Sequence, residues 1–121
     1  MESSIEKVVF MNQRRNEVYW ADVSFTDSTE KKRRPVIILS QNEYNEKEPD
    51  VIVCSVTTSS TNPYFLQISK KDLVKGVLFM ESGARADMIG RLNKLELGTR
   101  MDKITDEFHE KLVSKILELI R

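Results

Sequence analysis

The 121-residue sequence contains one cysteine, Cys54, and one histidine, His109. A single cysteine excludes an intrachain disulfide, so nothing indicates an oxidising compartment. With one residue of each kind, the clustered histidines and cysteines of a typical zinc site cannot be assembled. We therefore expect neither a disulfide framework nor a bound metal. We expect Cys54, in the middle of an apolar run, to be a small buried hydrophobic residue.

Net charge and long apolar runs are missing as well. Nineteen basic and nineteen acidic side chains cancel, which argues mildly against non-specific binding of nucleic acid. A local basic site is still compatible with this balance, because attraction depends on where the charges lie. No apolar run approaches the roughly 20 residues that cross a bilayer, and the run at 8–11 is too short for a signal peptide. We expect a single cytoplasmic domain without a membrane segment.

The apolar pattern predicts a protein rich in β-strands. Residues 1–15 are mostly polar and read as an N-terminal extension, followed by a domain over residues 16–121. In two runs, Val36–Leu39 and Val51–Val56, the apolar character is continuous, which is typical of strands covered on both faces in a small barrel or sandwich. Further strands are expected at Val18–Val23, Tyr64–Ile68 and Val77–Met80.

Helix signals are short except at the end of the chain. Capping-box patterns predict short helices opening at Ser40 and at Ser69, the second ending by Gly76. Residues 85–104 read as mixed short elements. Thr105 is expected to cap a final helix of about four turns, whose apolar stripe includes Phe108, Leu112, Ile116 and Ile120. His109 lies one position off this stripe and is expected at the surface. The sum is a mostly-β, α+β domain.

Several segments, in order, resemble the MazF/PemK family of toxin endoribonucleases over residues 16–120. They are Glu17–Val23 (EVYWADV), Lys31–Ser40 (KKRRPVIILS), the asparagines Asn42 and Asn45, Val51–Ser59 (VIVCSVTTS) and Arg85–Ile89 (RADMI). The resemblance implies a small SH3-like, CcdB-like β-barrel with short helices and a C-terminal helix. It also implies the toxin of a type II toxin–antitoxin system.

The sequence departs from the family pattern at three places. Asn16 replaces the usual glycine before the first strand, and Met88 replaces a signature lysine that could contact phosphate. The loop over residues 24–33 contains no glycine. None of these departures touches the two residues that the resemblance makes central.

The resemblance implies cleavage of single-stranded RNA by attack of a 2′-hydroxyl on its own phosphate, without metal or cofactor. One histidine excludes a paired-histidine mechanism. Arg34 matches the family's catalytic arginine, and its fork of donors suits a phosphate in the transition state. Thr57 matches the catalytic threonine, whose hydroxyl can donate to a phosphate oxygen or orient the 2′-hydroxyl. The ordinary alternatives are a surface charge at Arg34 and a plain strand residue at Thr57.

Other residues are candidates for holding the RNA. Lys31, Lys32 and Arg33 form a basic loop that either grips the backbone or is simply a solvated charge run. Arg85 could add a phosphate contact, and Thr58 or Ser59 could assist Thr57. Tyr19 and Trp20 could stack on unpaired bases, with only one of the two expected to be exposed.

The resemblance also implies partners: a homodimer, RNA in the groove between subunits, and a MazE-like antitoxin. The disordered acidic C-terminal segment of such an antitoxin would mimic phosphates in that groove. Two rival interpretations stay open. One is a CcdB-like toxin that binds gyrase and has no nuclease site, and the other is a non-catalytic SH3-like module that binds RNA or a peptide.

Overall fold

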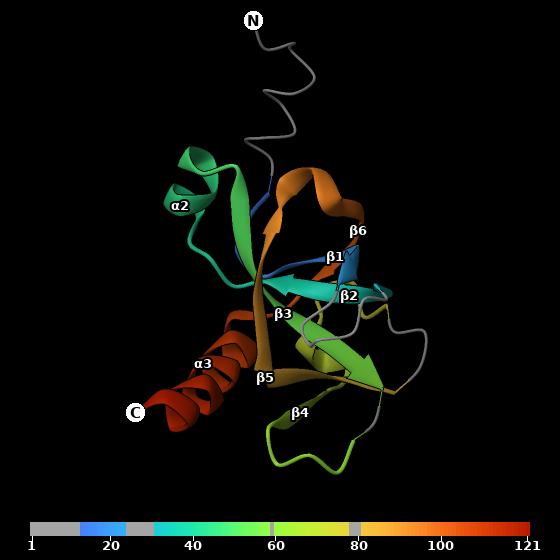
Figure 1. Cartoon of the computed structure of the whole chain (residues 1–121). Helices are drawn as coiled ribbons and strands as arrows, with labels where there is room; N and C mark the ends of the chain where they lie inside the picture. The colour runs from blue at the N-terminus through green and yellow to red at the C-terminus, as the bar shows by residue number, and fades with distance from the viewer. Residues whose placement is uncertain (1–12, 24–30, 59, 78–80) are drawn as a thin grey trace, which may run out of the picture.

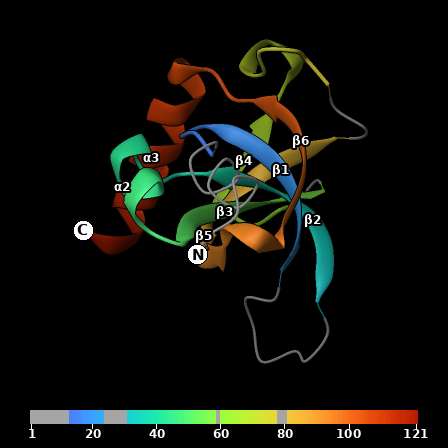
Figure 2. The ribbon, with the colours of Figure 1, turned by 90° about the horizontal axis from the view of Figure 1, so that it is seen from above.

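The computed structural model describes residues 13–23, 31–58, 60–77 and 81–121. Within them, six strands form one antiparallel sheet in the order β4-β5-β3-β2-β1-β6 (Figure 1). The strands are β1 Glu17–Val23, β2 Lys32–Ile38, β3 Asp50–Thr58, β4 Phe65–Ile68, β5 Ser82–Asn93 and β6 Leu97–Lys103. The helices are α2 Asn42–Lys47, α3 Asp106–Ile120 and the 3-10 turns η1 Lys70–Asp72 and η2 Lys94–Glu96. The sheet is strongly curved, as the view from above shows (Figure 2).

Both faces of the central strands are buried, as the continuous apolar runs predicted. On β2, Val36 and Ile38 belong to one hydrophobic cluster, whereas Ile37 belongs to another. On β3, Val53 and Cys54 divide between the same two clusters in the same way. Successive side chains of a strand point to opposite faces, so a core lies on each side of the sheet. The expectation for Cys54 is thereby confirmed.

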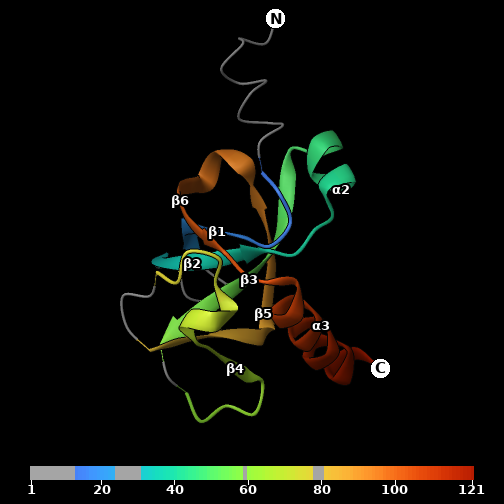
Figure 3. The ribbon, with the colours of Figure 1, turned by 180° about the vertical axis from the view of Figure 1, so that it is seen from behind.

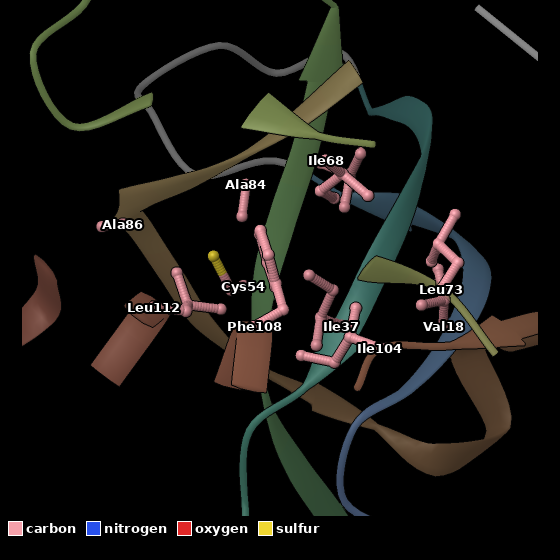
Figure 4. Packing of buried hydrophobic residues seen from close by; sticks show 11 residues of the cluster. Val18, Ile37, Cys54, Ile68, Leu73, Ala84, Ala86, Ile104, Phe108 and Leu112 are labelled. Carbon is pink, nitrogen blue, oxygen red and sulfur yellow. The ribbon is translucent and has the colours of Figure 1, made fainter. Parts of the chain in front are cut away.

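Helix α3 closes one of these two cores. Thr105 accepts a hydrogen bond from the backbone N–H of Phe108 at 3.2 Å, so the predicted cap is confirmed. Phe108 and Leu112 project from α3 into a cluster that includes Ile37 and Cys54 (Figure 4). Burial of this apolar stripe holds the helix on the sheet.

His109, expected at the surface, is buried instead. Only 8% of it is exposed. Asn16 donates to the Asp106 carboxylate at 3.4 Å, which brings the chain just before β1 onto the first turn of α3. The helix is therefore covered on a second side, and a pattern that considers only the sheet-facing stripe misses it.

Strand β5 is the main feature that the sequence did not reveal. Twelve residues long, it spans much of the region expected to hold short mixed elements. Cys54 pairs with Ile89 and Val56 with Ala84, so the single β3 residue Ser55 faces four residues of β5. This bulge coincides with a sharp bend of β5, visible in Figures 1 and 3.

The remaining expectations are partly confirmed. The short helix after β2 is present, but its N-cap is Gln41, and the Ser40 hydroxyl is bonded to Asn45 instead. The Ser69 capping box is present at η1. Two of the basic residues placed in a loop, Lys32 and Arg33, belong to β2.

Some expected segments fall outside the described residues. They are residues 1–12 of the extension, 24–30 of the loop and 78–80 of the strand expected at Val77–Met80. Val77 itself is described, and it lies outside any strand. Among the helices that are described, none is long and apolar enough to span a membrane.

Candidate active site

A cavity of about 540 Å³ opens beside the ends of β1, β2 and β3. Its lining combines an apolar floor and one carboxylate, Asp102, with cationic, hydroxyl and aromatic side chains. The last group comprises Trp20, Arg33, Arg34, Thr57, Thr58, Ser60 and Arg85. Guanidinium and hydroxyl groups donate hydrogen bonds, so the cavity suits an anion such as a phosphate.

Arg34 and Thr57 come together at this cavity from neighbouring strands. The antiparallel pairs of β2 and β3 run from Ile38 and Val53 to Val36 and Ser55. Arg34 and Thr57 each lie two residues beyond the last of these pairs, toward the same end of the two strands, and both line the cavity.

Thr57 carries an unsatisfied hydroxyl. The residue is half-buried, yet its Oγ1 atom is fully buried and has no hydrogen-bond partner in the described part of the chain. Leaving a buried polar group unpaired costs about 1–3 kcal/mol, so such groups in native proteins call for an explanation. Reaching an anion in the cavity requires this hydroxyl to rotate about χ1 into another staggered position.

Three arginines line the cavity, and their side chains are held differently. The guanidinium of Arg33 lies over the ring of Trp20, and Arg85 is paired with Asp87. The guanidinium of Arg34 makes no hydrogen bond or ion pair to the residues that the structure describes. Arg34 is half-buried, so its donors are both sheltered and available.

Arg85 is fixed from two directions. Its Nε and Nη2 atoms donate to the two Asp87 carboxylate oxygens at 2.8 and 2.7 Å. Its backbone carbonyl accepts from the Cys54 thiol at 3.1 Å, and burial of that thiol raises its pKa to about 12. The hydrogen bonds from Arg85 lower the pKa of Asp87, which is therefore ionised at neutral pH. Sequence reasoning proposed Arg85 but missed Asp87, whose only signal was its place in the RADMI segment.

The two aromatic residues of β1 divide as alternation requires. Trp20 lines the cavity, whereas Tyr19 is 8% exposed and packs in the core. The Tyr19 hydroxyl donates to Glu17 at 3.1 Å, and burial together with the Glu17 charge raises its pKa. Tyr19 as an RNA contact stays a prediction, and the burial of its ring makes Trp20 the more accessible of the two aromatic residues.

The other proposed RNA-binding residues divide into those that line the cavity and those that do not. Arg33 and Thr58 line the cavity, whereas Lys31 and Lys32 are exposed outside it. Ser59 lies outside the described residues. Ser60, which sequence reasoning passed over, is part of the lining.

No group of three or more metal-binding side chains gathers anywhere in the described ranges. The cavity presents arginines, hydroxyls and an aromatic ring beside apolar side chains, on a curved antiparallel sheet with a C-terminal helix. These features define a small β-rich protein with a cavity whose donors suit an anion.

Comparison with known proteins identifies the family. The model of the PemK-like, MazF-like toxins of type II toxin–antitoxin systems matches residues 14–120, so the chain belongs to that family. No curated protein sequence matches the chain. The family resemblance and the mostly-β, α+β fold expected from the sequence are both confirmed.

Solved structures share the fold over nearly the whole chain. An endoribonuclease from a mycobacterial species is 26% identical, with a TM-score of 0.72 over 92% of this chain and 94% of that one. A mycobacterial endoribonuclease in complex with its cognate antitoxin is 22% identical, with a TM-score of 0.69 over 89% and 94%. A MazE–MazF structure from Deinococcus radiodurans is 19% identical, with a TM-score of 0.70 over 89% and 95%.

Proposed function

We propose that this toxin is an endoribonuclease that cuts single-stranded RNA without a metal or cofactor. The observation that carries the proposal is that Arg34 and Thr57 line one and the same cavity. Family membership supports it, as do structural relatives described as endoribonucleases. A gyrase-binding toxin or a passive binding module has no need of this pair.

The proposed reaction uses the RNA's own nucleophile. The 2′-oxygen bonds to phosphorus, the bond from phosphorus to the 5′-oxygen breaks, and the products are a 2′,3′-cyclic phosphate and a 5′-hydroxyl. The proton lost from the 2′-hydroxyl is balanced by a proton gained at the 5′-oxygen.

Arg34 and Thr57 would act on the charge that accumulates at phosphorus. The guanidinium donates to two phosphate oxygens, and preorganised donors of this kind favour the transition state over the ground state. A guanidinium holds its proton too tightly to act as a base, so stabilisation of charge is the role we assign to Arg34. The Thr57 hydroxyl, turned into the cavity by the substrate, donates to the same phosphate.

The remaining candidates would hold the RNA on either side. Arg85, aligned by Asp87, and Arg33 supply positive charge, Thr58 a further hydroxyl, and Trp20 a ring on which an unpaired base can stack. Lys31 and Lys32 lie just outside the cavity, where they attract the backbone electrostatically.

We also propose a homodimer and a MazE-like antitoxin as partners. The mycobacterial relative bound to its cognate antitoxin and the MazE–MazF structure support this assignment. An acidic antitoxin segment would place carboxylates against the cavity arginines where phosphates otherwise bind, which blocks the site by charge mimicry.

The test is digestion of a long RNA by the purified protein in EDTA, followed by analysis of the new ends. We expect cuts in single-stranded regions that leave cyclic phosphate and 5′-hydroxyl ends. A 2′-deoxy substitution on the 5′ side of a cut should abolish it. Ends bearing a 5′-phosphate, or cutting that requires a divalent metal, would refute the mechanism, and no cutting of any RNA would favour the rival interpretations.

A further inference from the structure

Ser60 is a cavity residue with no role in the mechanism described above. It follows β3 by two positions, is half-buried and lines the same cavity as Arg34 and Thr57. Unlike Thr57, whose Oγ1 is buried and unsatisfied, Ser60 has an oriented hydroxyl.

A local turn sets that orientation. The backbone N–H of Asn62 donates to Ser60 Oγ at 3.0 Å. The Asn62 side chain in turn accepts from the backbone N–H of Tyr64 at 2.8 Å. Serine and asparagine commonly organise loops through short-range bonds of this kind.

The consequence concerns the hydroxyl hydrogen. A serine hydroxyl has one hydrogen to donate and two lone pairs that accept. Because Asn62 occupies a lone pair, the hydrogen of Ser60 must point elsewhere, and it is donated to none of the described residues. The residue therefore keeps a hydroxyl hydrogen to donate at the wall of a cavity that three guanidinium groups also line.

We propose that Ser60 is a further substrate-binding residue, which donates a hydrogen bond to a non-bridging oxygen of a nucleic-acid phosphate in this cavity. Asn62 is its positioning residue. The proposal rests on the proposed function for its substrate class, a single-stranded nucleic acid. It assigns Ser60 to binding rather than to the chemical step, which belongs to Arg34 and Thr57.

The experiment measures binding apart from cleavage. Fluorescent single-stranded DNA dodecamers of randomised sequence lack the 2′-hydroxyl, so they can bind but cannot react. Affinities are compared for the parent, Ser60→Ala and the neighbouring Thr61→Ala, an exposed residue outside the cavity. A hydrogen bond to a charged group predicts roughly 10-fold weaker binding for Ser60→Ala and no change for Thr61→Ala.

Salt dependence separates this bond from a general loss of the site. Ser60 is uncharged, so Ser60→Ala should weaken binding equally at every salt concentration. Arg85→Ala removes a charge, so it should reduce the slope of log affinity against log salt by about 0.7 for one phosphate contact. A reduced slope for Ser60→Ala would overturn the proposal, because it would show a disturbed arrangement of charges.

Asn62 supplies a readout that a merely structural role would not produce. Asn62→Ala keeps the backbone N–H that donates to Ser60 but removes the side chain that accepts from Tyr64, so it loosens the turn that holds Ser60. It should weaken binding in the same direction, and adding it to Ser60→Ala should cause no further loss, because the turn acts on binding only through the Ser60 hydroxyl. Independent, additive losses would refute the positioning role. Ser60→Thr, which keeps a hydroxyl, should retain most of the affinity.

The outcomes also separate this proposal from the nuclease function. When the substrate is an RNA that the protein can cleave, Ser60→Ala should raise KM about 10-fold and leave kcat unchanged. This result is expected for a contact that is equally strong in the substrate complex and in the transition state. Unchanged affinity and KM in a folded Ser60→Ala protein overturn the proposal and leave the nuclease intact. If strand binding depends on Ser60 but no RNA is cleaved, the result supports the binding role of Ser60 and refutes the proposed nuclease function. A parent protein that binds no strand overturns the role of Ser60.

Discussion

The guanidinium carbon of Arg33 lies 5.5 Å from the centroid of the Trp20 ring, within the range of a cation–π contact. Both side chains line the cavity, from the paired strands β1 and β2. The contact holds an extended cationic side chain against an aromatic platform, so base stacking and phosphate attraction are available at the same point.

Trp20 is the only tryptophan of the chain, so it reports on this cavity alone. We predict that titration with single-stranded RNA changes its fluorescence emission saturably, because a base stacked on the indole quenches it or alters its polarity. Arg33→Ala should change the emission of the free protein, because it removes the cation above the ring. If RNA binds by anisotropy while Trp20 emission stays constant, the strand does not occupy this cavity.

Breaking the Arg85–Asp87 pair should impair binding more than stability. The two side chains are 21% and 30% exposed, and ion pairs with this much solvent contribute about 1 kcal/mol or less. We predict that Asp87→Asn raises KM several-fold, since Arg85 loses its alignment, while the midpoint of thermal unfolding shifts by only a few degrees.

The matched control is the pair between Arg91 and Asp50, at 2.8 Å, which joins β5 to β3 outside the cavity. Asp50→Asn should leave KM unchanged. Equal effects of Asp87→Asn and Asp50→Asn on KM would deny Arg85 a place in substrate binding.

The packing of α3 against the sheet should contribute strongly to the free energy of unfolding. Leu112 is fully buried in the core beneath the helix, so Leu112→Ala should lower the free energy of unfolding by about 2–5 kcal/mol. Leu117 on the same helix is 41% exposed, and Leu117→Ala should cost well under 1 kcal/mol in the monomer. Denaturant unfolding of both variants gives the comparison, and similar losses would mean that α3 does not pack as described.

His109 should make stability depend on pH. Burial lowers its pKa, with the Arg15 charge acting in the same direction and the Glu110 and Asp106 charges opposing it. The unfolded chain then binds the proton more tightly, so the free energy of unfolding should rise from the lowered folded pKa up to about 6.5 and level off above it.

Chemical denaturation between pH 5 and 8 measures this slope. One proton gives at most about 1.4 kcal/mol per pH unit, and His109→Gln should remove the slope that His109 supplies below pH 6.5. A slope of the opposite sign, or one that His109→Gln leaves unchanged, would contradict this role of His109.

What the sequence revealed depended on how local the determining interactions are. The strand β1 and the helix α3 follow from residue type, capping and apolar spacing within one segment, so both were predictable. Strand β5 was not, because its bend arises where Ser55 of β3 faces four residues of β5. That mismatch between distant segments leaves no local pattern.

The site shows the same division. Arg34 and Thr57 stand in recognisable segments, so a resemblance was enough to nominate them. Choosing between Tyr19 and Trp20 required knowing which face of β1 meets the core, and alternation says only that the two differ. The roles proposed for Asp87 and Ser60 rest on their contacts with Arg85 and Asn62, and contacts cannot be read from residue type.

The most direct test of the shared-phosphate mechanism is single-turnover cleavage by Arg34→Ala, Thr57→Ala and the double variant, in EDTA and at saturating RNA. Each single variant should fold as the parent does and cleave about 100-fold or more slowly, as removal of a donor to a developing charge generally does. If both side chains act on one phosphate, the double variant should lose clearly less than the product of the two single losses. Cleavage at the parental rate by either folded single variant, or fully multiplicative losses in the double variant, would contradict it.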